Sequence, residues 1–125
     1  MGIRYEKDTI LNWVNEMGKF LRLLVDKWEG KLTDLDVAPA YKAFFELERE
    51  AIIDMDDHQL VAYAASLEQE QIRPMAQMML YDGLISGDKA FIRKAKVLFE
   101  YHMKSSGSFS FEDYGILAQI DKELK

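Results

Sequence analysis

The stretch from Gln71 to Lys104 constrains the fold most, because it consists of two helical patterns joined by only three residues. In each half, apolar or small residues recur at steps of three and four, the spacing of one helix face. The residues concerned are Ile72, Met75, Ala76, Met79, Leu80 and Gly83 in the first half and Phe91, Ile92, Ala95, Leu98 and Phe99 in the second, whose stripe His102 extends. Gly87 can end the first helix in the left-handed conformation, and Asp88 can cap the second. So short a connection predicts an antiparallel helical hairpin.

The rest of the chain also favours helices. Two prolines and seven glycines in 125 residues leave little turn punctuation, and β-branched residues nowhere form the alternating runs of strands. A chain of this length with 49% hydrophobic residues suits one domain over residues 1–125. We therefore predict an all-α, single-domain bundle of about six helices. They are 8–29, 37–53, a short helix that starts at Asp56 or Asp57, the two helices of the hairpin over 71–104, and one that follows Ser110.

The expected N-terminal helix, residues 8–29, has a wide apolar face. The central row of this face is Ile10, Val14, Met17, Leu21, Leu24 and Trp28. It is widened by Leu11, Gly18 and Val25 on one side and by Trp13 and Phe20 on the other. A coiled-coil seam is narrower than this. Two interpretations stay open: the rest of the domain covers the face, or a second copy does. The residues expected at such a homodimer interface are Trp13, Met17, Phe20, Leu24 and Trp28. Gly18 lies inside the band, where it would let a neighbouring helix approach closely.

The segment Asp54–His58 is the one local cluster with metal-ligand chemistry. Asp54, Asp56 and His58 alternate as at the start of a calcium loop, but that loop needs glycine at its sixth position and glutamate at its twelfth. Gln59 and Ala65 occupy those positions. We therefore predict no metal site, and we expect this acidic segment to cap the short third helix.

The last helix has its own start signal. Ser110 followed by Asp113 resembles a capping box, and Phe109 and Tyr114 have the spacing of a hydrophobic staple. We expect this helix to turn inward a side made of Tyr114, Leu117, Ala118 and Leu124.

The charge distribution bears on possible partners. Residues 31–70 contain three Lys or Arg and ten Asp or Glu, a balance of −7 in a chain whose net charge is −6. Such a balance argues against nucleic acid, whose binding requires a basic face. Lys89, Arg93 and Lys96 form a basic ridge on the second hairpin helix. This ridge either meets the acidic 31–70 segment or stays solvated.

Location can also be inferred from composition. No apolar run approaches the roughly 18 residues of a membrane span, and the N-terminal residues lack the apolar core of a signal peptide. The absence of cysteine excludes disulfides and thiolate zinc sites and suits a reducing compartment. We expect a cytoplasmic protein that does not bind membranes.

The sequence offers little catalytic chemistry. It contains no G-x-S-x-G elbow, no phosphate-binding glycine loop and no Glu-x-x-His pair of a di-iron bundle. We predict no catalytic residue and no cofactor. His102 extends an apolar stripe and is expected to be a satisfied boundary histidine. If a ligand pocket exists, Tyr81, Tyr101 and His102 are the candidates to line it.

The hairpin resembles a tetratricopeptide unit. Ala76 and Gly83 stand where such a repeat places small residues on its first helix, and Ala95-x-x-x-Phe99 is similar to the small-then-aromatic pair of its second. The distance from Gly83 to Ala95 is longer than in a standard repeat, and a second copy is lacking. The chain as a whole is similar to an uncharacterised family of short bacterial all-helical proteins, whose first helix resembles DTILNWVNEMGKFLRLLVDK here. This resemblance implies a bacterial cytosolic protein and no catalytic residue.

These observations favour a non-catalytic helical protein–protein interaction module with an unknown partner. Self-association as a homodimer is the expected mode, because the face of the N-terminal helix is so wide. The alternative is a small-molecule-binding or enzymatic protein with a pocket between helices. A filled core favours the first interpretation, and a cavity with converging polar groups near His102 or Tyr81 favours the second.

Overall fold

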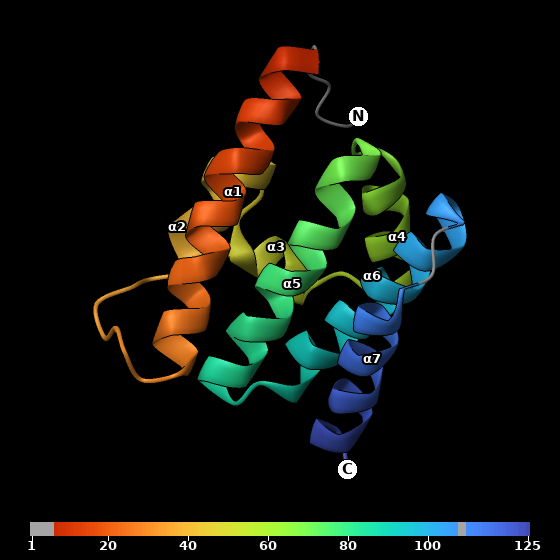
Figure 1. Ribbon diagram of the computed structural model, residues 1–125. Coiled ribbons are helices and arrows are strands. Elements are labelled where there is room, and N and C mark those ends of the chain that lie inside the picture. The colour runs from red at the N-terminus through yellow and green to blue at the C-terminus, as the bar shows by residue number, and fades with distance from the viewer. Residues whose placement is uncertain (1–6, 108–109) are drawn as a thin grey trace.

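The chain is all-α, which confirms the predicted fold class. The computed structural model describes residues 7–107 and 110–125, and these form seven α-helices and no strand (Figure 1). The helices are α1 (Lys7–Trp28), α2 (Ala38–Phe45), α3 (Arg49–Ile53), α4 (Asp57–Ala65), α5 (Gln69–Ser86), α6 (Lys89–Ser106) and α7 (Phe111–Glu123). In this part of the chain no helix is both long and apolar enough to span a membrane.

The predicted hairpin is formed by α5 and α6. Gly87 ends α5 in the left-handed conformation with φ 76°, and its N–H donates to the carbonyl of Gly83. The Asp88 carboxylate accepts from the N–H of Ala90 at 2.9 Å and caps α6. Both predictions at this turn are confirmed.

Gly83 sets how closely the two hairpin helices approach. A Cβ at this position would lie 2.6 Å from Cγ1 of Ile92 and 2.9 Å from the Ile92 backbone nitrogen. Carbon atoms in contact are normally about 3.5–4.0 Å apart, so a side chain does not fit here. The backbone of α6 therefore packs directly against α5.

The expected helix over 37–53 is wrong in one respect, because it divides into α2 and α3. Glu46 adopts a left-handed conformation with φ 57°, which ends α2. A carbonyl near this break, that of Phe44, accepts from Nε1 of Trp13 at 3.1 Å, so a side chain from α1 satisfies it. The described chain consequently has seven helices rather than about six.

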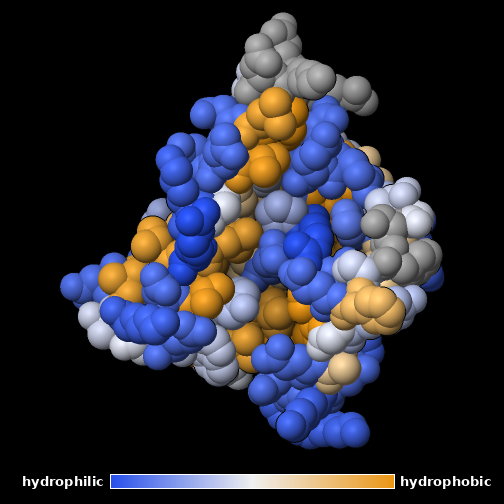
Figure 2. Space-filling model, viewed as in Figure 1, coloured by the Kyte–Doolittle hydropathy of each residue, from blue (hydrophilic) through white to orange (hydrophobic). Residues whose placement is uncertain are grey.

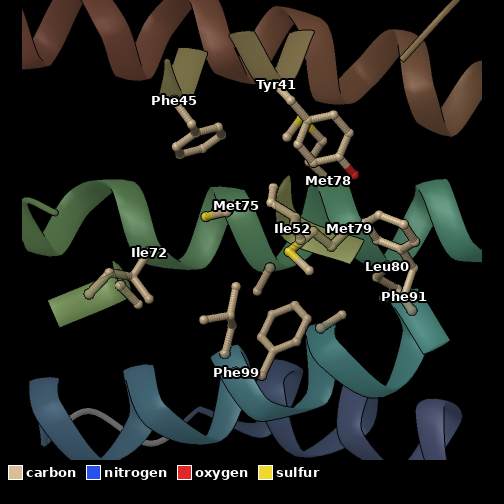
Figure 3. Packing of buried hydrophobic residues seen from close by; sticks show 14 of the residues in the cluster. Tyr41, Phe45, Ile52, Ile72, Met75, Met78, Met79, Leu80, Phe91 and Phe99 are labelled. Atoms are coloured by element: carbon tan, nitrogen blue, oxygen red, sulfur yellow. The ribbon is translucent and has the colours of Figure 1, made fainter. Parts of the chain in front are cut away.

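The core surrounds α5, which runs between α1 on one side and α6 on the other (Figure 1). Tyr41 and Phe45 point from α2 toward α5, and Phe99 points toward it from α6 (Figure 3). Three methionines of α5 are fully buried among these rings and fill the interior: Met75, Met78 and Met79. These three methionines therefore belong to the core.

The start of α7 agrees with the prediction. The Ser110 hydroxyl accepts from the N–H of Asp113 at 3.1 Å, which confirms Ser110 as the N-cap. The expected staple residue Phe109 lies outside the described residues.

The inward side expected for α7 is wrong. Of the four residues predicted there, Tyr114 and Ala118 are exposed, and Leu117 and Leu124 are only half-buried. The buried residues of this helix are Asp113 and Ile120. The helix is turned this way because the Asp113 carboxylate is held inside by the guanidinium of Arg73.

Candidate functional site

Three of the five residues predicted as an interface lie in the interior of their own chain. Trp13, Met17 and Leu24 are buried. The indole of Trp13 packs edge-on against the rings of Phe44 and Phe45, with centroid distances of 5.9 and 5.5 Å. α2 and α5 therefore cover this side of α1, which corrects the interface expected from the sequence.

The other two predicted interface residues differ from each other. Phe20 is half-buried, with its ring 5.7 Å from that of Phe44. Trp28 is 44% exposed at the end of α1. Of the five, only Trp28 presents a large apolar surface to solvent.

A second apolar row on α1, here called the α1 seam, is left largely uncovered. Its members follow one another at steps of three and four: Leu11, Val14, Gly18, Leu21, Val25 and Trp28. Leu11 is 54% exposed, and the four residues between it and Trp28 are half-buried. Figure 2 shows apolar surface along this helix, interrupted by hydrophilic side chains. A Cβ on Gly18 would meet nothing within 4 Å, so no helix of the same chain makes the close approach expected there.

The polar edge of the α1 seam carries charges that their own chain does not pair. One charge beside the seam is paired, because Lys19 lies 3.3 Å from the carboxylate of Glu16, three residues earlier on the same helix. Within the described chain, neither Arg22 nor Asp26 forms an ion pair. Arg22 is exposed and Asp26 is partly exposed, so both charges face solvent beside the seam.

The basic ridge of α6 does not pair with the acidic 31–70 segment. Lys96 instead pairs with Asp121 of α7 at 2.7 Å, and the other two ridge residues are exposed. Beside the ridge, Lys94 donates to the backbone carbonyl of Met55, which lies in the acidic segment but is not a carboxylate. The ridge thus helps to hold α7 and leaves most of its charge solvated.

A groove between α6 and α7 is lined by residues other than those predicted for a pocket. It is open to solvent, has a volume of 220 Å³, and is lined by Glu100, Met103, Lys104, Tyr114 and Leu117. Tyr81, Tyr101 and His102 are half-buried and do not line it. Pockets that hold small ligands commonly measure about 300–1,000 Å³, so this groove is small for that purpose.

A cluster of charged groups ties α5 to α7 next to His102. Arg73 donates from Nε to Asp113 at 2.9 Å and from Nη2 to Glu112 at 3.0 Å. Burial lowers the pKa of His102, while the charge of Asp113 opposes the shift and that of Arg73 adds to it. The Nδ1 atom of His102 is buried and has no hydrogen-bond partner among the described residues. The expectation of a satisfied histidine is therefore wrong for this nitrogen.

A second cluster, centred on the buried carboxylate of Asp82, is completely satisfied. Arg49 donates from Nε and Nη2 to its two oxygens at 2.8 and 3.0 Å, and the Tyr41 hydroxyl donates at 2.6 Å. The guanidinium of Arg49 also lies over the ring of Phe91, 4.3 Å from its centroid. Burial, together with the charge of Asp82, raises the pKa of Tyr41 far above its usual range, so the hydroxyl stays protonated and donates. Because every group is engaged, this cluster suits a structural tie rather than catalysis.

Neither cluster was predicted from the sequence. A signal was present, since Asp82 and Asp113 stand beside apolar positions of helices, and a carboxylate is buried there only when it is paired. Their arginine partners are 33 and 40 residues away, and sequence spacing does not identify partners at such separations.

The capping interpretation of the acidic segment before α4 is confirmed. The Asp56 carboxylate accepts from the N–H of Gln59 at 2.7 Å, and the Gln59 side chain accepts from the N–H of Asp56 at 2.9 Å. Over residues 7–107 and 110–125, no three His, Cys, Asp or Glu side chains are grouped so that they could hold a metal ion.

No family model, curated protein or solved structure was found to match this chain. The resemblance to short bacterial helical proteins and to a tetratricopeptide unit therefore stays a prediction, and function has to be inferred from the geometry alone.

Proposed function

We propose that this protein is a non-catalytic helical interaction module that associates with itself. The observation that carries the proposal is the α1 seam, a continuous apolar row whose members Leu11 and Trp28 are about half exposed. Contiguous apolar surface of this kind commonly marks a contact site. The steps of three and four suit another helix as the occupant.

The interior supports the same proposal. The large side chains around α5 fill the core, and the buried polar groups of Asp82, Arg49 and Tyr41 are engaged with one another. General acid–base catalysis needs a group within hydrogen-bond reach of a substrate atom, and Asp82 and Tyr41 are buried and bonded within the fold. The acidic balance of residues 31–70 speaks against nucleic acid as the partner, and the absence of cysteine suits a cytoplasmic location.

Small-molecule binding is the second candidate, favoured by the groove between α6 and α7. Met103, Tyr114 and Leu117 give it an apolar lining, and Glu100 and Lys104 are polar groups at its wall. Its small volume and open mouth would bury little of a ligand, so we place this function behind self-association.

Sedimentation velocity over a wide range of concentrations tests the proposal. We expect the average mass to rise from that of one chain toward that of two. A protein that stays at the mass of one chain at hundreds of micromolar would contradict self-association. For the second candidate, a thermal-shift screen with small molecules should find stabilisation that Leu117→Ala removes and Leu23→Ala does not.

A further inference from the structure

Gly18 and Trp28 of the α1 seam have complementary shapes. The indole of Trp28 projects partly into solvent, and Gly18 leaves open space where a side chain would otherwise stand. The two residues are about 15 Å apart along one helix at 1.5 Å per residue, so Trp28 cannot fill the notch of its own chain. A second copy of α1 that runs in the opposite direction can fill it.

We propose that α1 pairs with α1 of a second copy in antiparallel orientation, so that Trp28 of each copy packs over Gly18 of the other. This pairing rests on the self-association proposed above and adds its surface, orientation and register. In this register Leu21 of one copy faces Val25 of the other. The contact is symmetric, as in most homodimers, because the same residues contribute from both sides of a two-fold axis.

The same register brings opposite charges together. In an antiparallel helix pair, the same edge of each helix meets its counterpart, so Arg22 of one copy lies beside Asp26 of the other. The two-fold axis repeats this pair, and both residues lack an ion pair within their own described chain. Arg22 and Asp26 therefore each gain an ion pair that the described part of the single chain does not supply.

Net charge also favours α1 as the contact face. Between residues 16 and 28, α1 carries two acids, Glu16 and Asp26, and three bases, Lys19, Arg22 and Lys27, a balance of +1. Residues 31–70 carry −7, so two copies that approached through that segment would repel each other.

Two other arrangements of the α1 seam are less favourable. A parallel pair sets Trp28 against Trp28 and leaves the two Gly18 notches facing each other. It also places the Arg22 edges of the two copies on opposite sides of the contact, so that Arg22 does not meet Asp26. An antiparallel pair shifted by one heptad sets Trp28 against Leu11 and Gly18 against Leu21. The shifted pair leaves Arg22 without the acidic partner that the proposed register supplies.

Substitutions along α1 test the register. Gly18→Leu fills the notch and Trp28→Ala removes the side chain that enters it, so each should raise the dimer dissociation constant about tenfold or more. Two matched controls truncate leucines of similar exposure on the same helix. Leu11→Ala lies on the seam but outside the overlap, and Leu23→Ala lies on the other flank. Both should change the constant less than about twofold. Circular dichroism verifies that each variant keeps its helices.

Charge exchange tests the contact between Arg22 and Asp26. Arg22→Asp alone places two acids together across the pair, and Asp26→Arg alone places two bases together, so each variant should associate weakly. A mixture of the two variants should associate again, because every cross-contact then joins an aspartate to an arginine. A mixture that associates no better than either variant alone would overturn this contact.

Introduced cysteines test the orientation, because the natural chain has none. In the proposed register residue 22 lies close to the two-fold axis, so the two sulfurs of Arg22→Cys come within disulfide reach. The two sulfurs of Asn15→Cys would be about 24 Å apart along the helix axis. Oxidation should therefore cross-link Arg22→Cys and not Asn15→Cys. A parallel pair would cross-link neither, because it places this edge of the two copies on opposite sides of the contact.

The outcomes separate this pairing from self-association in general. If the wild type stays monomeric, self-association fails and the pairing with it. If the wild type dimerises but Leu23→Ala weakens the dimer as much as Trp28→Ala does, or Arg22→Cys does not cross-link, the pairing is overturned while self-association stands.

Discussion

The two ends of the α5–α6 hairpin differ in how completely their polar groups are satisfied. At the closed end, where the two helices join, Asp82 is buried and accepts three hydrogen bonds from Arg49 and Tyr41. One residue further along α5, Gly83 holds the two backbones in contact. Solvent has little access to Asp82 and Tyr41, whereas the Arg49 side chain is 22% exposed.

At the open end, where α7 packs near Arg73, the polar groups are less completely paired. The guanidinium shares its donors between buried Asp113 and exposed Glu112. Nδ1 of His102, on α6, has no hydrogen-bond partner in the described chain. The 220 Å³ groove lies between α6 and α7.

This difference indicates where the fold tolerates change. Loss of Asp82 at the closed end removes the counter-charge of Arg49 and also leaves the fully buried Tyr41 hydroxyl without an acceptor, which is costly. Loss of one partner at the open end leaves groups that water or a second acid can satisfy, which costs less. We therefore expect substitutions at the closed end to have the larger effects.

The largest effect is expected for Asp82→Ala. It leaves the partly buried Arg49 guanidinium without its counter-charge and the Tyr41 hydroxyl without its acceptor. The free energy of unfolding should fall by about 3 kcal/mol or more, as measured by urea denaturation. A loss below that of Asp113→Ala would invert the comparison between the two ends.

Gly83→Ala is expected to follow, with a loss of about 1–3 kcal/mol, because the added methyl overlaps Ile92 and forces α5 and α6 apart. Gly18→Ala is the matched control, since it makes the same change in a helix where the Cβ meets nothing. The control should gain up to about 1 kcal/mol through helix propensity. Equal losses at both glycines would show that the contact at Gly83 is not the cause.

Asp113→Ala tests the open end. Arg73 loses its buried acceptor but keeps the exposed Glu112, so the unfolding free energy should fall by about 1.5 kcal/mol. The double variant Asp113→Ala with Glu112→Ala should lose more, and the urea midpoints of the three proteins give the difference. If the double variant is no less stable than Asp113→Ala, Glu112 does not take over as the partner.

A smaller effect is expected for Ser110→Ala, which removes the cap of α7. The N–H of Asp113 then loses its acceptor, and the cost should be about 1 kcal/mol. Ser110→Asp keeps an acceptor at this position and should restore most of the loss. A urea midpoint for Ser110→Ala equal to that of the wild type would contradict the cap.

The smallest effect concerns the pH dependence of His102. Burial lowers the pKa of His102 below its ordinary 6.5, so the unfolded chain takes up this proton first as the pH falls. Stability should therefore drop through the range just below pH 6.5, and His102→Gln should make that drop shallower. Melting temperatures of the two proteins across this range test the sign. A steeper drop in the variant would show that protonated His102 is favoured in the fold.

The features that could be predicted from the sequence are those with local causes. Gly87 and Asp88 mark the hairpin turn, and Asp56 and Ser110 cap their helices, because in each case the groups that interact are within four residues of one another. The break at Glu46 could not be predicted, since glutamate has no preference for the left-handed conformation and a carbonyl near the break accepts from Trp13, far away in the sequence.

The candidate site was only partly predictable. The wide apolar face of α1 was identified, but which flank stays uncovered depends on where α2 packs, and that is settled by long-range contacts such as Trp13 with Phe44. The buried pairs of Asp82 and Asp113 depend in the same way on residues far away in the sequence. Sequence periodicity finds the faces of helices, and tertiary packing decides their partners.

The dependence of α1 on α5 has a consequence for how the chain is made. Ribosomes deliver α1 before α5, so the cover that α5 gives to α1 is missing until residues 69–86 have also emerged. A nascent chain therefore displays a wide apolar face throughout the synthesis of the intervening segment. That segment is the acidic one, residues 31–70, and its charge of −7 would keep neighbouring nascent chains apart during the interval in which they are most prone to aggregate.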